Sequence, residues 1–271
     1  PNGAPADLGA DVTDVLGIKK YDPEAQQEAQ LLTKQPQKPQ SAIARFLMRF
    51  KWYRKLFMKP KRKGGFPDWI VKTDETRIQN LTTLFEMERN KGTKFSVTEK
   101  VDGQSATYYL RKISKRKYEF GVCSRNIYLG TPDNSSYWTI AKKYNIENVL
   151  RQLIGDYETI VLQGEICGNQ IQGNKYHISG YDLFAFNLIY PDHKCGTAEI
   201  KKLLEPYGIK TVPIVEEDKT LPETIAELVE YSKGKSVVRK EQKREGVVMR
   251  NVRSNISFKV INPDFLLAEK D

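Results

Sequence analysis

Alternating apolar and polar positions predict strands through most of the chain after residue 90. Phe95 and Val97 alternate with Ser96 and Thr98, which is the period of a strand, and this strand would end at Lys100. Asp102-Gly103 is a turn signal, so the segment 105–110 is predicted to return beside the first strand as a hairpin. The basic run 111–117 is predicted to be a turn. Further strands are predicted at 118–123, 159–164, 181–190, 246–250 and 256–261.

Apolar positions three and four residues apart predict helices between these strands. They are expected at 41–57, 137–155 and 198–207, and a capping box formed by Thr220 and Glu223 predicts another helix up to Ser232. Strands and helices do not alternate regularly, as they would in a doubly wound parallel sheet. The predicted fold class is therefore α+β, with mostly antiparallel sheets flanked by helices.

The first 65 residues differ in character from the remainder. Residues 26–40 are rich in Gln, Lys and Pro, which is typical of a flexible linker. The helix predicted at 41–57 has one apolar face and carries Arg45, Arg49 and Arg54 on the other. Such a helix can lie on a membrane or bind a partner, or it can pack on its own protein with its charges in water. We predict a linker with this basic helix over 1–65 and a folded domain over 66–271.

Composition narrows the class of protein. No apolar run approaches the ~20 residues that span a bilayer, so no membrane is expected. Cys123, Cys167 and Cys195 are odd in number and lack paired spacing, which argues against a disulfide framework and against a zinc site. The expected location is cytoplasmic or another reducing intracellular compartment. The 44 basic residues against 34 acidic ones give a net charge of +10, which favours a polyanionic partner. The protein is expected to be a monomer.

Lys100 is the first candidate for chemistry. A lysine at the end of a largely apolar strand loses hydration, and desolvation lowers the pKa of its ammonium group, which makes it a nucleophile near neutral pH. The alternative, on these residues alone, is a solvated lysine in front of an Asp-Gly turn. Other charged side chains also stand at or within predicted strands, namely those of Asp102, Arg125, Glu165, Glu245 and Lys259.

The order of these segments resembles the nucleotidyltransferase motifs shared by polynucleotide ligases and mRNA-capping enzymes. The segments are Lys100-Val-Asp102-Gly103, Ser124-Arg125-Asn126, Gly164-Glu165, Glu245-Gly246-Val-Val-Met-Arg250 and Phe258-Lys259-Val260. With the lead-in from Phe66 to Asn80, they look most like ATP-dependent RNA ligases of the nick-sealing branch. The segment 11–23 looks like the tether of the subgroup whose OB domain precedes the catalytic domain. The resemblance implies an ATP-grasp-like nucleotidyltransferase domain over 66–271, with 1–65 left from that tether.

The resemblance also implies a reaction in three steps. Lys100 would attack the α-phosphate of ATP, release pyrophosphate and form a lysyl-AMP. The AMP would pass to a 5′-phosphate end of RNA, and a 3′-hydroxyl would then seal the strand and release AMP. The implied cofactors are ATP and Mg²⁺ or Mn²⁺, and the implied partner is a nicked duplex or RNA ends.

Individual roles follow from the same resemblance. Lys259 would neutralise the α-phosphate, and Arg125 would hold either the ribose or the RNA 5′-phosphate. Asp102, Glu165 and Glu245 would hold the metal, because Mg²⁺ prefers carboxylate oxygens; Glu165 is equally suited to the ribose hydroxyls. Glu99 would accept a hydrogen bond from the adenine amino group, and Phe186 would stack on adenine. Without the resemblance, the carboxylates are read as surface charges and Phe186 as a core residue.

The sequence departs from the family pattern at two positions. Asn187 stands where many relatives have aspartate, and Ile261 stands where the last motif has a second lysine. A cation for the phosphates is therefore missing or comes from elsewhere. The alternatives are a DNA ligase, a capping guanylyltransferase, and a basic nucleic-acid-binding module in which Lys100 is one contact among many.

Overall fold

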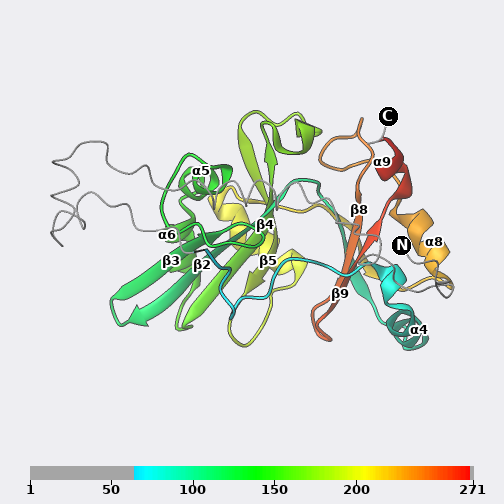
Figure 1. The fold of residues 1–271 in the computed structure, drawn as a ribbon. Helices are drawn as coiled ribbons and strands as arrows, with labels where there is room; N and C mark the ends of the chain where they lie inside the picture. The colour runs from blue at the N-terminus through cyan, green and yellow to red at the C-terminus, as the bar shows by residue number, and fades with distance from the viewer. Residues whose placement is uncertain (1–63, 269–271) are drawn as a thin grey trace, which may run out of the picture. The chain divides into compact units, whose positions relative to one another are not determined.

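Two β-sheets with helices on their outer sides form residues 64–268, the part of the chain that the computed structural model describes (Figure 1). These residues belong to one compact unit of the chain. The linker, the tether and the basic helix predicted before residue 64 lie outside the described residues. The larger sheet has the order β3-β2-β4-β5-β6, with bounds Lys117–Cys123, Gln104–Ser114, Thr159–Gly168, Tyr181–Ile189 and Lys210–Thr211. The smaller has the order β7-β1-β8-β9, with bounds Ile214–Lys219, Phe95–Glu99, Gly246–Asn251 and Ile256–Ile261.

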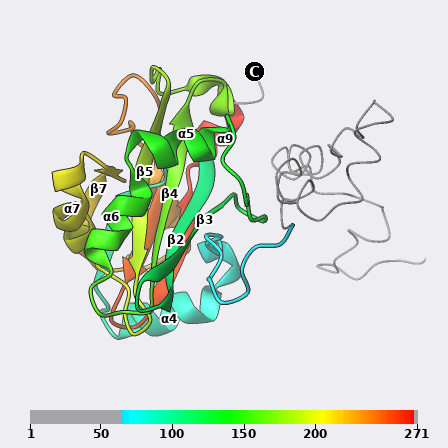
Figure 2. The same ribbon diagram turned by 90° about the vertical axis from the view of Figure 1, so that its left-hand side faces the viewer.

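Helices cover the outer side of each sheet. Figure 2 shows α5 and α6 in front of the larger sheet, and Figure 1 shows α4, α8 and α9 beside β8 and β9 of the smaller one. Except for the parallel pair β5–β6, the paired strands are antiparallel, so the predicted α+β class is confirmed. The α-helices are α4 Thr82–Asn90, α5 Ser136–Lys143, α6 Ile146–Leu153, α7 Thr197–Leu204, α8 Ile225–Ser232 and α9 Pro263–Ala268, and the 3₁₀-helices are η1 Ile78–Asn80, η2 Ile171–Asn174 and η3 Glu205–Tyr207.

Each sheet buries one face in its own core. Tyr108 and Leu162 of the larger sheet pack with Leu150 of α6 in one cluster, and Phe95 of the smaller sheet packs with Phe258 in another. Because side chains alternate along a strand, the opposite faces are left for polar residues. The two sheets approach each other where the Arg250 guanidinium of β8 lies 5.6 Å from the ring centre of Phe186 in β5. Ser96 Oγ of β1 also donates to Thr197 Oγ1 at the start of α7.

The hairpin predicted around Asp102-Gly103 is wrong. β1 pairs with β7 and β8, whereas β2 pairs with β3 and β4, so the chain crosses from one sheet to the other at 100–103. The glycine serves close packing rather than a hairpin turn. A Cβ on Gly103 would lie 2.4 Å from the Ile166 carbonyl oxygen and 2.9 Å from Glu165 Cγ. The crossing therefore rests directly on β4.

Two strand boundaries also differ from prediction. The run 111–117 does not form a turn throughout, because β2 continues to Ser114 and β3 begins at Lys117. Arg111 is paired there with Glu119 across the two strands, at 2.7 Å. β4 runs beyond Glu165 to Gly168, so this carboxylate lies within the strand. The short strands β6 and β7 were not predicted.

Two of the predicted helices differ from the structure, one in its continuity and one in its first residue. The helix predicted over 137–155 is divided into α5 and α6 by Asn145, which has a left-handed φ of 47°. Asparagine tolerates that conformation better than most residues. The capping residue of α8 is Thr224, whose hydroxyl accepts a hydrogen bond from the Glu227 amide, rather than Thr220. The helix that ends with η3 at Gly208 agrees with the prediction.

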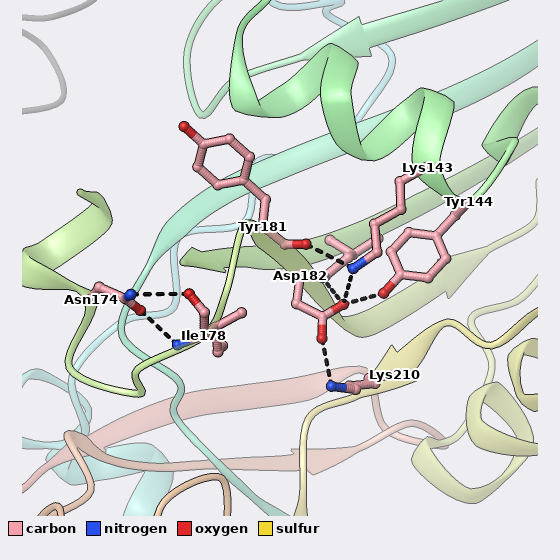
Figure 3. Close-up of polar contacts among 8 residues, drawn as sticks. Lys143, Tyr144, Asn174, Ile178, Tyr181, Asp182 and Lys210 are labelled. Carbon is pink, nitrogen blue, oxygen red and sulfur yellow. Dashed lines mark hydrogen bonds and ion pairs between the residues drawn. The ribbon is translucent and has the colours of Figure 1, made fainter. Parts of the chain in front are cut away.

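Asp182 in β5 holds a polar cluster on the larger sheet (Figure 3). It is 5% exposed and accepts hydrogen bonds from Lys210 Nζ at 2.5 Å, Lys143 Nζ at 3.2 Å and the Tyr144 hydroxyl. Burial acts to raise the pKa of Asp182, but these donors outweigh burial and the pKa lies below its ordinary value. The cluster ties α5 and β6 to β5.

Candidate functional site

Lys100 projects from the crossing between the sheets into a group of carboxylates. Its Nζ donates to both oxygens of Glu245, at 2.7 and 2.6 Å, and Glu245 directly precedes β8 of the smaller sheet. The side chain of Lys100 is 26% exposed and that of Glu245 is 15% exposed, so the pair is accessible but largely desolvated. The structure thus brings together two of the predicted catalytic residues that are 145 positions apart in sequence.

The predicted fall in the pKa of Lys100 is wrong. Burial does act to lower the pKa, as expected, but the negative charges of Glu245, Glu165 and Asp102 outweigh burial and raise the pKa above its ordinary value. The lysine is therefore an ammonium in this state. For Glu245, burial is the largest effect and raises the pKa, with Asp102 adding to it and Lys100 opposing it.

Asp102 lies two residues after Lys100 and has a cation of its own. Lys175 Nζ, from the segment after η2, lies 2.6 Å from Asp102 Oδ2. The neighbouring Tyr176 hydroxyl accepts a hydrogen bond from the Asp102 amide at 2.9 Å. Glu165, the third predicted metal ligand, projects from β4 close to Gly103 and acts on the charge of Lys100.

The three predicted metal ligands share this region without forming a closed set. Among residues 64–268, the group of three potential ligands with donor atoms within 4.8 Å of one another is His193, Cys195 and Glu199 at the start of α7. Asp102 and Glu245 are instead each held by an ammonium group. The donor chemistry fits Mg²⁺ or Mn²⁺, because such ions keep several waters and reach carboxylates through them. The ammonium groups occupy places that a cation would take.

Lys259 in β9 approaches the same group of charges. Its backbone amide donates to the Thr76 carbonyl at 2.9 Å, so the lead-in segment before η1 lies along β9. Burial lowers the pKa of Lys259, and the charges of Lys100 and Arg77 lower it further against Asp74 and Glu245. The predicted pair of cations, Lys100 and Lys259, is therefore close enough to interact. Ile261, two residues along β9, is 8% exposed.

Arg125 follows β3 and is clamped by the lead-in segment. Its Nη2 and Nε bind the two oxygens of Asp74 at 2.6 and 3.1 Å. Nearby, the Thr73 hydroxyl contacts the Ser105 hydroxyl at 2.5 Å. The side chain of Arg125 is 26% exposed and that of Asp74 is 50% exposed. Arg125 is thus fixed at the rim of the site by a residue that the sequence did not single out.

Glu99 is buried on β1 immediately before Lys100. Its Oε2 accepts from the Val237 amide at 2.7 Å, while Oε1 has no hydrogen-bond partner within the described part of the chain. Burial raises the pKa of Glu99, against the hydrogen bonds of the Ser236 side chain and the Val237 amide and against the charge of Arg244. A cavity of about 530 Å³ borders the same loop and is lined by Val237, Val212 and Phe184 among others, but by none of the predicted site residues.

Phe186 and Asn187 sit at a bulge in β5. Gln163 of β4 pairs with Asn187 and Gly164 pairs with Ala185, so Phe186 is the extra residue. The Phe186 side chain is partly buried against the small apolar cluster around Val101. The Asn187 amide donates to Gln163 Oε1 at 2.8 Å, so the asparagine joins the sheet's own hydrogen bonds.

Sequence reasoning missed Lys175, Tyr176 and Asp74, and gave Arg250 no role. Arg250 is 7% exposed, donates to the Thr98 hydroxyl at 2.9 Å and has a buried Nε without a partner in the described residues. Arg250 stood within a recognised motif, so the signal existed. Lys175 and Tyr176 lie in a polar loop without periodicity, and only the fold places them beside Asp102.

Comparisons with known proteins agree on one family. A family model described as RNA ligase matches residues 93–261, which includes Lys100, Glu165, Glu245 and Lys259. No curated protein matches the chain. In residues 64–268, no helix has the length and apolar character to cross a bilayer.

Similar chains among solved structures include several of Naegleria gruberi RNA ligase. The structure with PPi is 32% identical, with a TM-score of 0.71, covering 97% of this chain and 68% of that one. A mutant with ATP and Mn is 30% identical, with a TM-score of 0.72, covering 99% of this chain and 69% of that one. A mutant with AMP and Mn is 30% identical, with a TM-score of 0.72 and coverage of 97% and 68%.

Proposed function

This chain belongs to the RNA ligase family, and we propose that it is an ATP-dependent ligase that seals nicks in RNA through a lysyl-AMP on Lys100. The observation that carries the proposal is the position of Lys100 Nζ, 2.6 Å from Glu245, in a partly desolvated group of carboxylates between the two sheets. A lysine used only for nucleic-acid contact has no need of that surrounding. We further propose that residues 66–271 form the catalytic domain and that 1–65 belongs to an OB-domain tether.

The first step needs an uncharged amine at Lys100. Glu245 is hydrogen-bonded to the ammonium group, and burial raises the pKa of this carboxyl, so Glu245 is placed to take the proton. The amine then attacks the α-phosphate, the bond to pyrophosphate breaks, and a phosphoramidate forms. Lys259 supplies positive charge beside the attacked phosphate. A phosphoramidate resists water until its nitrogen is protonated, so AMP is retained until it is handed on.

Asp102, Glu165 and Glu245 would hold Mg²⁺ or Mn²⁺, partly through water. Such an ion would neutralise the carboxylates that raise the pKa of Lys100 and would shield the phosphates from them. Support comes from the Naegleria structures, which contain ATP and Mn. Glu165 remains equally suited to the ribose hydroxyls, because its place within β4 lets it reach either group.

Glu99 and Phe186 would select and hold adenine. The buried Oε1 of Glu99, which has no hydrogen-bond partner among the described residues, is an acceptor that suits the amino group that adenine carries at C6, where guanine has a carbonyl oxygen. Phe186 projects from a bulge, and bulges often re-aim a side chain at a site. Arg125 would bind ribose or the 5′-phosphate of RNA once Asp74 releases or orients it.

Incubation with α-³²P-labelled ATP and Mn²⁺ tests this function. We expect label on the protein, loss of label in Lys100→Ala, and transfer of AMP to a 5′-phosphorylated nick in RNA. Labelling by GTP instead would indicate a capping enzyme, and sealing of DNA alone would indicate a DNA ligase. A protein that takes no label from either nucleotide, yet binds RNA, would be a binding module, and the proposal would be wrong.

A further inference from the structure

Lys175 is a second ammonium group in the candidate site, and neither the family resemblance nor the predicted roles use it. Its Nζ lies 2.6 Å from Asp102 Oδ2, with the two side chains 21% and 13% exposed. The pair matches the pair of Lys100 with Glu245 in type and length. Two of the three carboxylates proposed to hold a divalent ion, Asp102 and Glu245, are thus each paired with a lysine.

The loop that carries Lys175 is rigid at both ends. The Asn174 amide donates to the Ile178 carbonyl and the Ile178 amide donates back to Asn174 Oδ1, each at 3.0 Å, which closes the loop (Figure 3). The Tyr176 hydroxyl accepts from the Asp102 amide, which attaches the loop to the crossing segment. The closed loop places the backbone of Lys175 beside Asp102, while its flexible four-carbon stem gives the ammonium group more than one reachable position.

The surroundings of Lys175 keep its ammonium group near two of the proposed metal ligands. Its Nζ lies 4.4 Å from the ring centre of Phe265 in α9, so the aromatic face helps to hold the cation on one side. The charge of Lys175 also acts on Glu245, where it opposes the rise in pKa caused by burial. The ammonium group is therefore within the electrostatic reach of two proposed metal ligands.

We propose that Lys175 exchanges partners: it neutralises Asp102 while no divalent ion is bound, and it contacts the nucleotide phosphates when the ion takes its place on Asp102. Two positive charges beside one carboxylate repel each other, so a divalent cation on Asp102 would weaken the hold of this carboxylate on the ammonium group. The displaced ammonium group stays near Asp102 because its loop is closed, and the phosphates that accompany the ion offer it a new anion. This inference rests on the proposed function.

An exchange of partners by Lys175 predicts that removal of its charge strengthens the binding of Mn²⁺ and weakens the binding of ATP. In Lys175→Met, which keeps an apolar stem on Phe265 and removes the charge, Mn²⁺ binding without nucleotide should tighten, by about tenfold. The KM for ATP in lysine labelling should rise, also about tenfold, because a phosphate contact is lost. Lys175→Arg, which keeps the charge, should lie near the wild type in both measurements. Free Mn²⁺ counted by electron paramagnetic resonance gives the first quantity without any turnover.

Lys210→Gln is the matched control. It removes a lysine from a Lys–Asp pair of 2.5 Å on Asp182, outside the site, and should change neither quantity. Mn²⁺ affinity that is unchanged or weaker in Lys175→Met, with its circular dichroism intact, would overturn the exchange. Weakening of Mn²⁺ and ATP together would show a merely structural role. The two proposals fail separately: wild-type protein without label refutes the ligase function, whereas labelled wild type with unaltered Mn²⁺ binding in Lys175→Met refutes only the exchange.

Discussion

The Asp182 cluster and the Lys100 site use the same residue types in opposite proportions. Asp182 is a single carboxylate served by two lysines and a tyrosine, and its pKa is lowered although burial acts to raise it. In the Lys100 site, carboxylates gather round each ammonium group, and the pKa of Glu245 is raised. A carboxylate that accepts hydrogen bonds from two cations and a hydroxyl, as Asp182 does, is fully paired and acts as a structural contact. In the other site the charges of three carboxylates act on the ammonium group of Lys100, and carboxylates that repel one another are stabilised by a further cation.

The two clusters predict different consequences for the removal of a carboxylate: a loss of stability at Asp182, and a loss of ligand binding and chemistry at the Lys100 site. Removing a carboxylate from an over-satisfied cluster leaves cations without a partner, which costs stability. Removing one from a cluster of mutually repelling carboxylates relieves repulsion, so the cost falls on ligand binding and chemistry instead. Substitutions in the two clusters should therefore separate the two costs.

Glu245→Gln should give the largest effect. It removes the acceptor of the Lys100 proton and one proposed metal ligand, so the rate of lysyl-AMP formation should fall by about 100-fold or more. The free energy of unfolding should stay within about 1 kcal/mol of the wild type. Single-turnover labelling and urea denaturation measure the two quantities. Equal labelling would exclude Glu245 from the site, and a parallel loss of stability would erase the contrast with Asp182.

Gly103→Ala should reduce stability and labelling together, because Gly103 packs closely against β4 and lies three residues after Lys100. The new Cβ would lie 2.4 Å from the Ile166 carbonyl oxygen and 2.8 Å from Cys167 Sγ, so the crossing must move away from β4. We expect a loss of about 3 kcal/mol in unfolding free energy together with slower labelling of the folded protein. Gly65→Ala, where a Cβ meets nothing within 4 Å, is the matched control. Wild-type stability of Gly103→Ala would contradict the close approach.

Asp182→Asn should cost stability and leave labelling unchanged. The loss of the charge that binds Lys143 and Lys210 should reduce the unfolding free energy by about 2 kcal/mol at pH 7. Because the pKa of Asp182 is lower in the folded protein than its ordinary value of 3.8, its stabilising effect is present above pH 4 and lost as the pH falls further. The deficit of the variant should therefore shrink below pH 4. A deficit that is constant from pH 7 to pH 3 would contradict this assignment.

Lys194→Met should give the smallest effect, with the opposite sign. Burial, with the charge of Arg250, lowers the pKa of Lys194 to about 8, against partial opposition from Glu75. Between pH 8 and 10.5 the unfolded chain holds the proton more tightly than the folded one, so stability rises with pH across that window. The variant should be about 1 kcal/mol more stable than the wild type at pH 7 and equal to it above pH 10.5. Urea titrations at both pH values decide the matter.

The sequence predicted the fold class and most strands because their periodicity is local. β8 and β9 were found nearly to the residue, and Lys100 and Glu245, which the structure brings together, were singled out from short motifs. Pairing between distant strands is not local. The period of two that identified β1 and β2 could not tell a hairpin from a crossing between sheets, and the glycine at 103 had a packing reason that no turn rule contains.

The errors at the site share a physical cause. The pKa of Lys100 was predicted from the desolvation of one strand end, whereas its direction depends on charges from β4 and from the start of β8. Lys175 and Asp74 could not be predicted for the same reason, because each contacts a predicted residue that lies far from it in the sequence. A short motif points to a candidate residue, whereas the pKa of that residue depends on charges that the fold brings from other segments.

The crossing at 100–103 has a mechanical consequence. Lys100 and Glu245 both leave strands of the smaller sheet, whereas Glu165 belongs to the larger one, and the reactive amine lies on the covalent link between them. Any change in the angle between the sheets must alter the spacing from the amine to Glu165. A ligand that contacts both sheets would therefore change the distance between Lys100 and Glu165 as the sheets draw together, so ligand binding and the geometry around this amine are coupled.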